Sequence, residues 1–204
     1  MRFSWFHAAL TALAVCGVTA VPSRAADPRL LPPGTLPRSA WGAAAPRPGD
    51  IPQLVRRLTV HHTESPVCPA DPAKMAETLR SIQRYHQRDK HWTDTAYHLL
   101  IDRWGRVWEG RRLTAQGSSA TAYDLQDRVL VCLVGNFMKE EVNAQQWEAL
   151  TSTLAFLCHR YGIAPETITM HRQLAETDCP GDHLAARITD GSLLRAVRAR
   201  LAGR

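Results

Sequence analysis

The hydrophobic and polar positions of this chain follow two periodicities in turn, one typical of strands and one typical of helices. Short apolar, β-branched runs predict strands at residues 55–61, 97–102, 106–109, 129–134 and 167–170. Apolar residues at helical spacing predict helices over residues 71–90, 143–161 and 193–201. Because strands and helices alternate, we expect an α/β fold: a single domain with a central mixed β-sheet flanked by helices.

Local signals refine three of these elements. Asp71 and Pro72 form an N-cap and first-turn pair, and Asn143 is expected to cap the second helix. Gly162 is expected to end that helix in a left-handed conformation. The run at 129–134 is apolar without alternation, which predicts a strand that is buried on both faces.

The first 25 residues have the pattern of an export signal. Arg2 is followed by an apolar run at 8–20 and by small residues that fit cleavage after Ala25. That run is too short to span a bilayer, so we expect an exported protein, periplasmic or secreted, with no transmembrane segment. A faint lipoprotein-like box at 13–17 leaves lipoprotein anchoring as an alternative.

The rest of the chain is predicted to form a lead-in and one domain. Residues 26–37 are rich in Pro and Leu and predict an extended lead-in, and residues 38–204 predict a single domain. The whole chain has 204 residues with 45% hydrophobic content, enough for a sizeable core. Loss of two leader arginines lowers the formal charge from +6 to +4, and no Lys/Arg block with interleaved aromatics is present. We therefore expect no nucleic-acid partner. Separately, we expect the protein to be a monomer.

Cysteine content allows one disulfide. Removing the leader removes Cys16 and leaves Cys68, Cys132, Cys158 and Cys179. An even count in an oxidising compartment invites pairing. Cys132 lies in an apolar strand, and Cys179 is a candidate metal ligand together with His171. Cys68–Cys158 is therefore the disulfide that remains plausible.

The candidate chemistry is concentrated in residues 171–181. His171 and Cys179 flank a polar loop that is closed by Pro-Gly, and both side chains are donors that Zn²⁺ accepts. A third ligand is expected from the paired His61 and His62 at the end of the first strand, where alternation lets only one face the metal. Three protein ligands with an open fourth position is the catalytic arrangement. The structural alternative is a buried thiol and hydrogen-bonded imidazoles.

Several stretches together resemble one family. They are Pro-Arg-Ser-Ala-Trp-Gly-Ala at 37–43, Val-His-His-Thr at 60–63, Trp-Thr-Asp-Thr-Ala-Tyr-His at 92–98, the segment 102–111, Val-Gly-Asn-Phe at 134–137 and the segment 171–181. The chain resembles peptidoglycan recognition proteins, and the segments 92–98 and 102–111 resemble a part that these share with phage T7 lysozyme. The resemblance implies the type-2 amidase fold and a zinc-dependent N-acetylmuramoyl-L-alanine amidase. Such an enzyme hydrolyses the amide between the lactyl group of muramic acid and L-alanine.

The resemblance also assigns roles to single residues. It implies the metal ligands His61, His171 and Cys179, with His62 as a neighbour, and the catalytic residues Tyr97 and Thr177. Recognition-only members of the family have lost a ligand, whereas all three positions are filled here. The implied partner is therefore a peptidoglycan or muropeptide substrate, which Zn²⁺ would help to cleave.

The chain departs from the family pattern at two positions near these motifs. The phage Gly-Ser-His-Ala stretch reads Gly-Ser-Ser-Ala here, which places Ser119 where a histidine is usual. The glycine usual before Tyr97 is Ala96. The missing histidine puts the glycan or peptide preference in doubt more than the chemistry, whereas Ala96 is a mild change.

The sequence also allows two other functions. The first is a non-catalytic peptidoglycan-binding recognition module. The second is a Cys–His peptidase with Cys179 as nucleophile, which requires the thiol to be hydrogen-bonded to a base. His98 and Glu109 are weaker candidates, with a strand-core histidine and a solvated carboxylate as their structural interpretations. Trp41 and Trp108 are expected to serve packing.

Overall fold

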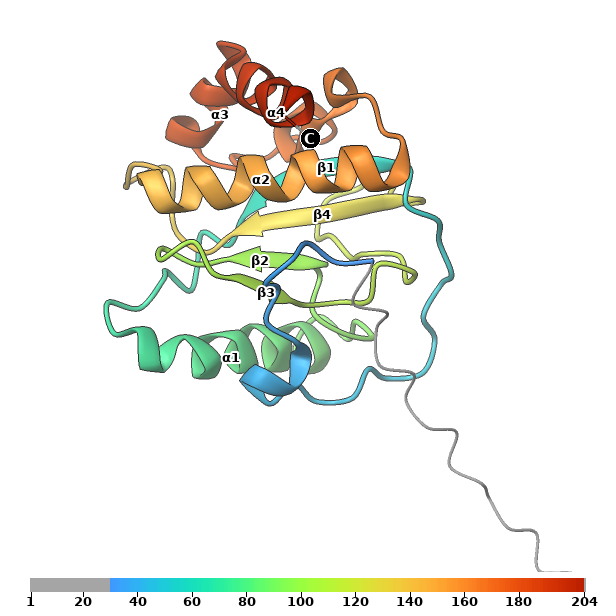
Figure 1. Ribbon diagram of the computed structural model, residues 1–204. Coiled ribbons are helices and arrows are strands. Elements are labelled where there is room, and N and C mark those ends of the chain that lie inside the picture. Colours follow the sequence, from blue (N-terminus) through green and yellow to red (C-terminus); the bar gives the residue numbers. More distant parts are fainter. Residues whose placement is uncertain (1–29, 204) are drawn as a thin grey trace, which may run out of the picture.

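A computed structural model describes residues 30–203 of the chain (Figure 1). The predicted signal peptide at 1–25 lies outside the described residues. None of the described helices is both long and apolar enough to cross a membrane.

Five strands form one mixed sheet in the order β3-β2-β4-β1-β5. They are β1 (Arg57–His62), β2 (Leu99–Ile101), β3 (Val107–Glu109), β4 (Arg128–Leu133) and β5 (Thr169–Met170). β4 runs parallel to β1 and β2, and β1 runs parallel to β5, whereas β2 and β3 pair antiparallel. The predicted α/β class with a central mixed sheet is confirmed.

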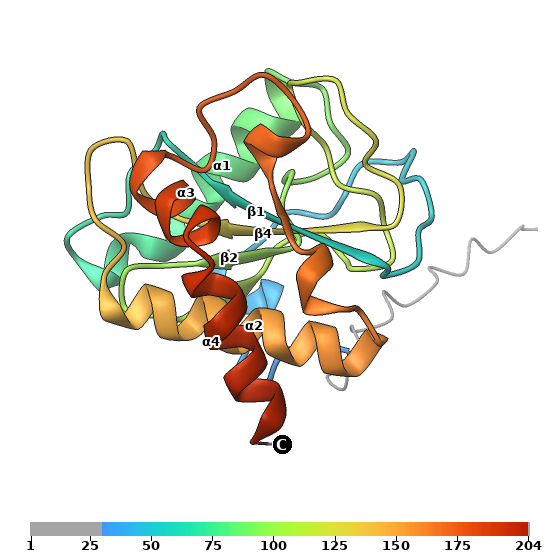
Figure 2. The ribbon, with the colours of Figure 1, turned by 90° about the horizontal axis from the view of Figure 1, so that it is seen from above.

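Helices cover both faces of this sheet. The α-helices are α1 (Met75–Arg88), α2 (Ala144–Tyr161), α3 (Asp182–Thr189) and α4 (Ser192–Ala202), and the short 3₁₀ turns are η1 (Arg38–Trp41), η2 (Pro72–Lys74), η3 (Pro165–Thr167) and η4 (His171–Gln173). Figure 1 shows α2, α3 and α4 on one side of the sheet and α1 with η1 on the other. Figure 2, turned by 90°, shows α4 crossing α2.

The central strand β4 explains why the sheet needs both layers. All six of its residues are buried: the apolar run predicts this for residues 129–133, and the sixth is the buried Arg128. Val129, Val131 and Leu133 join a cluster with Leu150 of α2 and Val197 of α4. The α1 face has a second cluster, which includes Trp41, Met75, Leu79 and Leu100.

The two clusters show why the predicted disulfide is wrong. Cys68 belongs to the cluster on the α1 face, whereas Cys158 of α2 belongs to the cluster on the opposite face. The sheet separates the two thiols. All four cysteines of the described residues are free.

The predicted helix ends agree with the structure in part. The Asn143 side chain accepts a hydrogen bond from the Gln146 N–H, and Gly162 ends α2 with φ at 64°. Asp71 caps as predicted, but the chain first makes the 3₁₀ turn η2 and α1 begins only at Met75. Helix α3 was missed because its eight residues carry too few apolar positions to form a pattern.

The end of the lead-in adds to the sheet edge. The Leu36 N–H donates to the Val107 carbonyl at 2.8 Å, and the Glu109 N–H donates to the Leu36 carbonyl at 2.9 Å. Trp41 and Trp108 are buried packing residues, as predicted. Glu109 is also buried and accepts from the Arg38 N–H at 3.2 Å, so the interpretation as a solvated carboxylate is wrong.

Candidate metal centre

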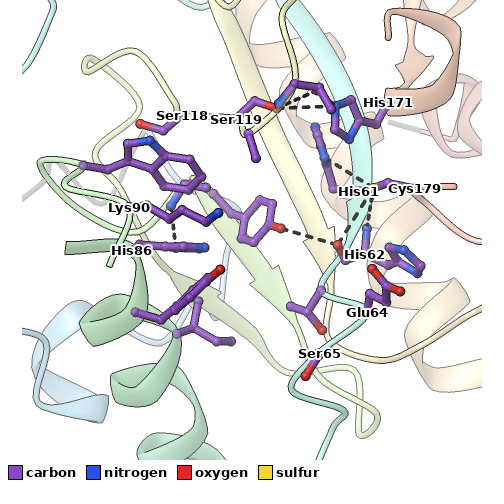
Figure 3. Close-up of a pocket in the computed structure, with 18 of the residues that line it drawn as sticks. His61, His62, Glu64, Ser65, His86, Lys90, Ser118, Ser119, His171 and Cys179 are labelled. Atoms are coloured by element: carbon purple, nitrogen blue, oxygen red, sulfur yellow. Dashed lines mark hydrogen bonds between the residues drawn. The ribbon is translucent and has the colours of Figure 1, made fainter. Parts of the chain in front are cut away.

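Three side chains predicted as ligands meet at the end of strands β1 and β5. His61 lies near the end of β1, His171 follows β5 directly, and Cys179 comes from the loop between η4 and α3. Because β1 and β5 are parallel neighbours, their carboxyl ends lie at the same edge of the sheet. Figure 3 shows His61, His171 and Cys179 turned toward one another.

The distances within this triad are short. One donor atom from each residue lies within 4.8 Å of the other two. The Cys179 Sγ is 3.5 Å from the His61 Nδ1, and the His61 and His171 ring centroids are 4.5 Å apart. The arrangement brings two imidazoles and a thiol to one point.

The hydrogen bonding of His171 tests whether a metal fits there. Its Nε2 lies 2.6 Å from the Thr121 Oγ1, whereas its Nδ1 is buried and has no hydrogen-bond partner. A buried polar atom without a partner is costly, so such an atom calls for an explanation. A nitrogen, nitrogen and sulfur donor set is one that Zn²⁺ accepts, so the residues fit this ion.

Burial keeps the two imidazoles neutral. Desolvation, followed by the nearby His171, holds the pKa of His61 well below its usual range, and desolvation lowers the pKa of His171 to about 4. Desolvation also raises the pKa of the Cys179 thiol to about 12. A neutral imidazole has a lone pair to offer to a metal. The buried Cys179 thiol can become a thiolate only when a cation lies beside it.

His62 points to the other face of the sheet. Its ring lies 6.2 Å from the Phe137 ring, and its Nδ1 accepts from the Phe137 N–H at 3.3 Å. Phe137 belongs to the cluster on the α2 face, together with Leu58 and Val60. Strand alternation therefore turns His61 to the triad and His62 away from it.

The two residues predicted as catalytic lie in the same cleft as the triad. Tyr97, just before β2, has its hydroxyl 3.4 Å from the His62 carbonyl and its ring 5.6 Å from that of His61. Desolvation raises the pKa of Tyr97 well above its usual value, so the hydroxyl keeps its proton. The Thr177 Oγ1 accepts from the Cys179 N–H at 3.2 Å, which leaves its own proton for another partner.

A cleft of about 570 Å³ opens from the triad. One wall is the segment 118–121, and the other comes from α1 and the residues after it, including Tyr85, Lys90 and Trp92. A larger hollow of about 1100 Å³ lies along residues 31–50, and of the candidate residues it includes only Glu109. All the predicted metal ligands and catalytic residues line the smaller cleft, which is therefore the candidate site.

Tyr123 and Thr121 were not predicted as part of this site. The Tyr123 hydroxyl lies 3.3 Å from the His61 Nε2, and Thr121 contacts His171 as described above. Both lie in the polar loop between β3 and β4, which has no periodicity to indicate which side chains turn inward. The only signal that could have found them was chemical. A histidine that binds a metal usually donates its other ring N–H to a partner, so acceptor side chains are expected near the predicted ligands.

His98 takes the structural role. It is buried, its Nδ1 accepts from the Leu130 N–H at 2.9 Å, and its Nε2 lies 2.9 Å from the Ala115 carbonyl. Both ring nitrogens are therefore satisfied inside the core.

Comparison with known proteins gives the family of this chain. The family model described as Amidase_2, N-acetylmuramoyl-L-alanine amidase, matches residues 51–182. This chain belongs to that family. The match includes His61, Tyr97, His171, Thr177 and Cys179.

Curated relatives and solved structures agree. The human N-acetylmuramoyl-L-alanine amidase is 34% identical over 159 residues, which is 74% of this chain and 27% of that protein. Peptidoglycan-recognition protein LB of Drosophila melanogaster is 31% identical over 161 residues, which is 76% of this chain and 67% of that protein. A Drosophila PGRP-LB tyrosine-to-phenylalanine mutant, solved in complex with tracheal cytotoxin, superimposes with a TM-score of 0.68 and 27% identity, covering 76% of this chain and 92% of that one.

The chain spans only part of the length of some relatives. It spans about a quarter of the pig and human amidases that it matches, 26% and 27% of their lengths. The similarity therefore concerns about a quarter of each of those proteins.

Proposed function

We propose that this chain is a zinc-dependent N-acetylmuramoyl-L-alanine amidase. The observation that carries the proposal is the triad of His61, His171 and Cys179, whose buried His171 Nδ1 has no protein partner. Family membership and the amidase names of curated relatives support the same reaction. His61, His171 and Cys179 would hold the ion, and the cleft would hold the substrate.

The reaction adds water across one amide bond. The oxygen of water bonds to the lactyl carbonyl carbon, the C–N bond to L-alanine breaks, and the alanine amine leaves with a proton. A bound Zn²⁺ supplies Lewis-acid chemistry, polarising a carbonyl and making water a better nucleophile at neutral pH.

The chain itself contributes hydrogen bonds. The Tyr97 hydroxyl, protonated and beside the triad, donates to the carbonyl oxygen as negative charge develops there, a contribution of ~2.7–4 kcal/mol for a positioned donor. The Thr177 hydroxyl orients the attacking water or the carbonyl. It carries no charge and supplies position only.

The substrate we propose is peptidoglycan or a muropeptide released from it. The Drosophila LB mutant and recognition protein LE were both solved in complex with tracheal cytotoxin, which in the LE complex is a monomeric diaminopimelic acid-type peptidoglycan. We further propose export to the periplasm or outside the cell, from the leader at 1–25, and one amidase domain over residues 38–204.

A defined muropeptide tests the reaction. Mass spectrometry should find the free glycan acid and the intact stem peptide, with masses that sum to the substrate plus one water. A chelator should abolish turnover and Zn²⁺ should restore it. Cys179→Ala should lose zinc and turnover, while Cys68→Ala, a thiol on the same face of the sheet but outside the cleft, should keep both.

Other outcomes would identify the alternatives. Full activity after verified metal removal, with cleavage inside the stem peptide, would establish the Cys–His peptidase and overturn the amidase. The 3.5 Å contact between the Cys179 Sγ and the His61 Nδ1 is the observation that favours the peptidase alternative. Zinc-loaded protein that binds the muropeptide without cleaving it would establish a recognition module.

A further inference from the structure

One loop places a hydroxyl against each histidine of the triad. Thr121 and Tyr123 both belong to the segment between β3 and β4. The Thr121 Oγ1 is 2.6 Å from the His171 Nε2, and the Tyr123 hydroxyl is 3.3 Å from the His61 Nε2. In Figure 3 this segment, marked by Ser118 and Ser119, lies beside His171, and a dashed line joins Ser119 to His171.

The contacted nitrogens are the ones turned away from the point where the three donors meet. The His61 Nδ1 faces the Cys179 Sγ, and the His171 Nδ1 is the buried atom without a partner. A neutral imidazole that offers the Nδ1 lone pair must carry its proton on Nε2. Each Nε2–H then points at a hydroxyl oxygen that can accept it.

We propose that Thr121 and Tyr123 are positioning residues that accept these two protons, and so hold both imidazoles in the tautomer and orientation that present Nδ1 to one ion. The proposal rests on the zinc site proposed above. It goes further in assigning two residues outside the ligand set, which act only through His171 and His61.

The loop is itself held in place. The Thr121 N–H donates to the Ser119 Oγ at 3.2 Å, and the two hydroxyl oxygens are 2.9 Å apart. The buried Arg111 donates to the Gln116 carbonyl at 2.9 Å and to the Ser118 Oγ at 3.1 Å. These bonds restrict the Thr121 hydroxyl before any metal binds, which is what an outer partner of a ligand requires.

Zinc affinity measured by competition with a chromophoric chelator tests the proposal. Outer partners of metal ligands typically contribute about 10–100-fold in affinity. We expect Thr121→Val to weaken zinc binding within that range. Tyr123→Phe should act toward its lower end, because its contact is 3.3 Å rather than 2.6 Å. Thr121→Ser, which keeps the hydroxyl, should restore affinity.

Matched controls separate positioning from folding. Thr151→Val and Tyr161→Phe remove the same hydroxyls from bonds within or beside α2, to the Trp147 and Leu30 carbonyls. These controls should lower the melting temperature of the metal-free protein without changing the zinc dissociation constant. The cobalt-substituted absorption spectrum should shift in Thr121→Val and Tyr123→Phe but not in the controls.

Unchanged zinc affinity and an unchanged cobalt spectrum in both site variants, with zinc bound by the wild type, would overturn this inference and leave the proposed amidase standing. A wild type that binds no zinc would overturn both. If Thr121→Val does not fold, Tyr123→Phe carries the test, because it removes one oxygen and no carbon.

Discussion

His98 and His171 are both buried histidines next to strands of the same sheet, yet they are bonded in opposite ways. His98, before β2, has its Nδ1 paired with the Leu130 N–H and its Nε2 with the Ala115 carbonyl. His171, after β5, has its Nε2 beside Thr121 and its Nδ1 paired with nothing. A fully satisfied imidazole stabilises the core, whereas a buried nitrogen without a partner marks a place for a ligand.

Replacing a triad histidine should give the largest effect and test which imidazoles bind metal. His61→Ala should remove most of the zinc and lower activity by more than the roughly 100-fold that changes outside the ligand set can cost. His62→Ala should keep most of the zinc, because His62 packs on Phe137 at the other face. Metal analysis by mass spectrometry checks this, and the reverse pattern would show that the wrong histidine was assigned.

Tyr97→Phe should give the next largest effect and leave the metal in place. Loss of a hydrogen bond made in the transition state should lower kcat and kcat/KM together by ~10²-fold or more, with KM little changed. Steady-state kinetics on one muropeptide, with zinc content measured beside it, checks this. The Tyr97 hydroxyl also lies 3.4 Å from the His62 carbonyl, so unchanged kinetics with a lower melting temperature would assign it a structural role instead.

His98→Leu should affect stability alone. The substitution keeps an apolar side chain of similar size but leaves the buried Leu130 N–H unpaired, which costs ~1–3 kcal/mol of unfolding free energy. Urea unfolding of the metal-free protein measures the loss, and chelator competition should give a wild-type zinc dissociation constant. Weaker zinc binding by the folded variant would contradict the division between the two histidines.

The same substitution should reduce the dependence of stability on pH. Desolvation lowers the pKa of His98 to about 4, with the charge of Arg111 acting in the same direction and the Ala115 carbonyl opposing it. The folded pKa is below the unfolded value, so this stability is present above about pH 6.5 and is lost as the pH falls toward about 4.

From about pH 7 to about pH 5, His98 should therefore account for a loss on the order of 2 kcal/mol in wild type that His98→Leu lacks. Comparing the two proteins without metal cancels the titration of the triad histidines, which both retain. Parallel stability curves for the two proteins would mean that His98 is not held neutral in the fold.

Much of the fold follows from local patterns. The apolar run of β4 predicted a strand buried on both faces, and Asn143 with Gly162 marked the ends of α2, because each signal depends on neighbours in sequence. Helix α3 and the failed Cys68–Cys158 pairing were beyond such patterns. Helix α3 is too short to show a periodicity. The pairing of Cys68 with Cys158 depends on which face of the sheet each cysteine occupies.

The sequence by itself determined the chemical types at the site and the strand that positions one of them. His61 and His62 alternate at the end of β1 because the strand period is two, and His171 and Cys179 lie in one polar stretch. Only the tertiary structure decided which nitrogens are satisfied. Thr121 and Tyr123 reach the triad across 50 and 62 residues of chain, and contacts of that separation arise from the packing of the loop and not from any local preference.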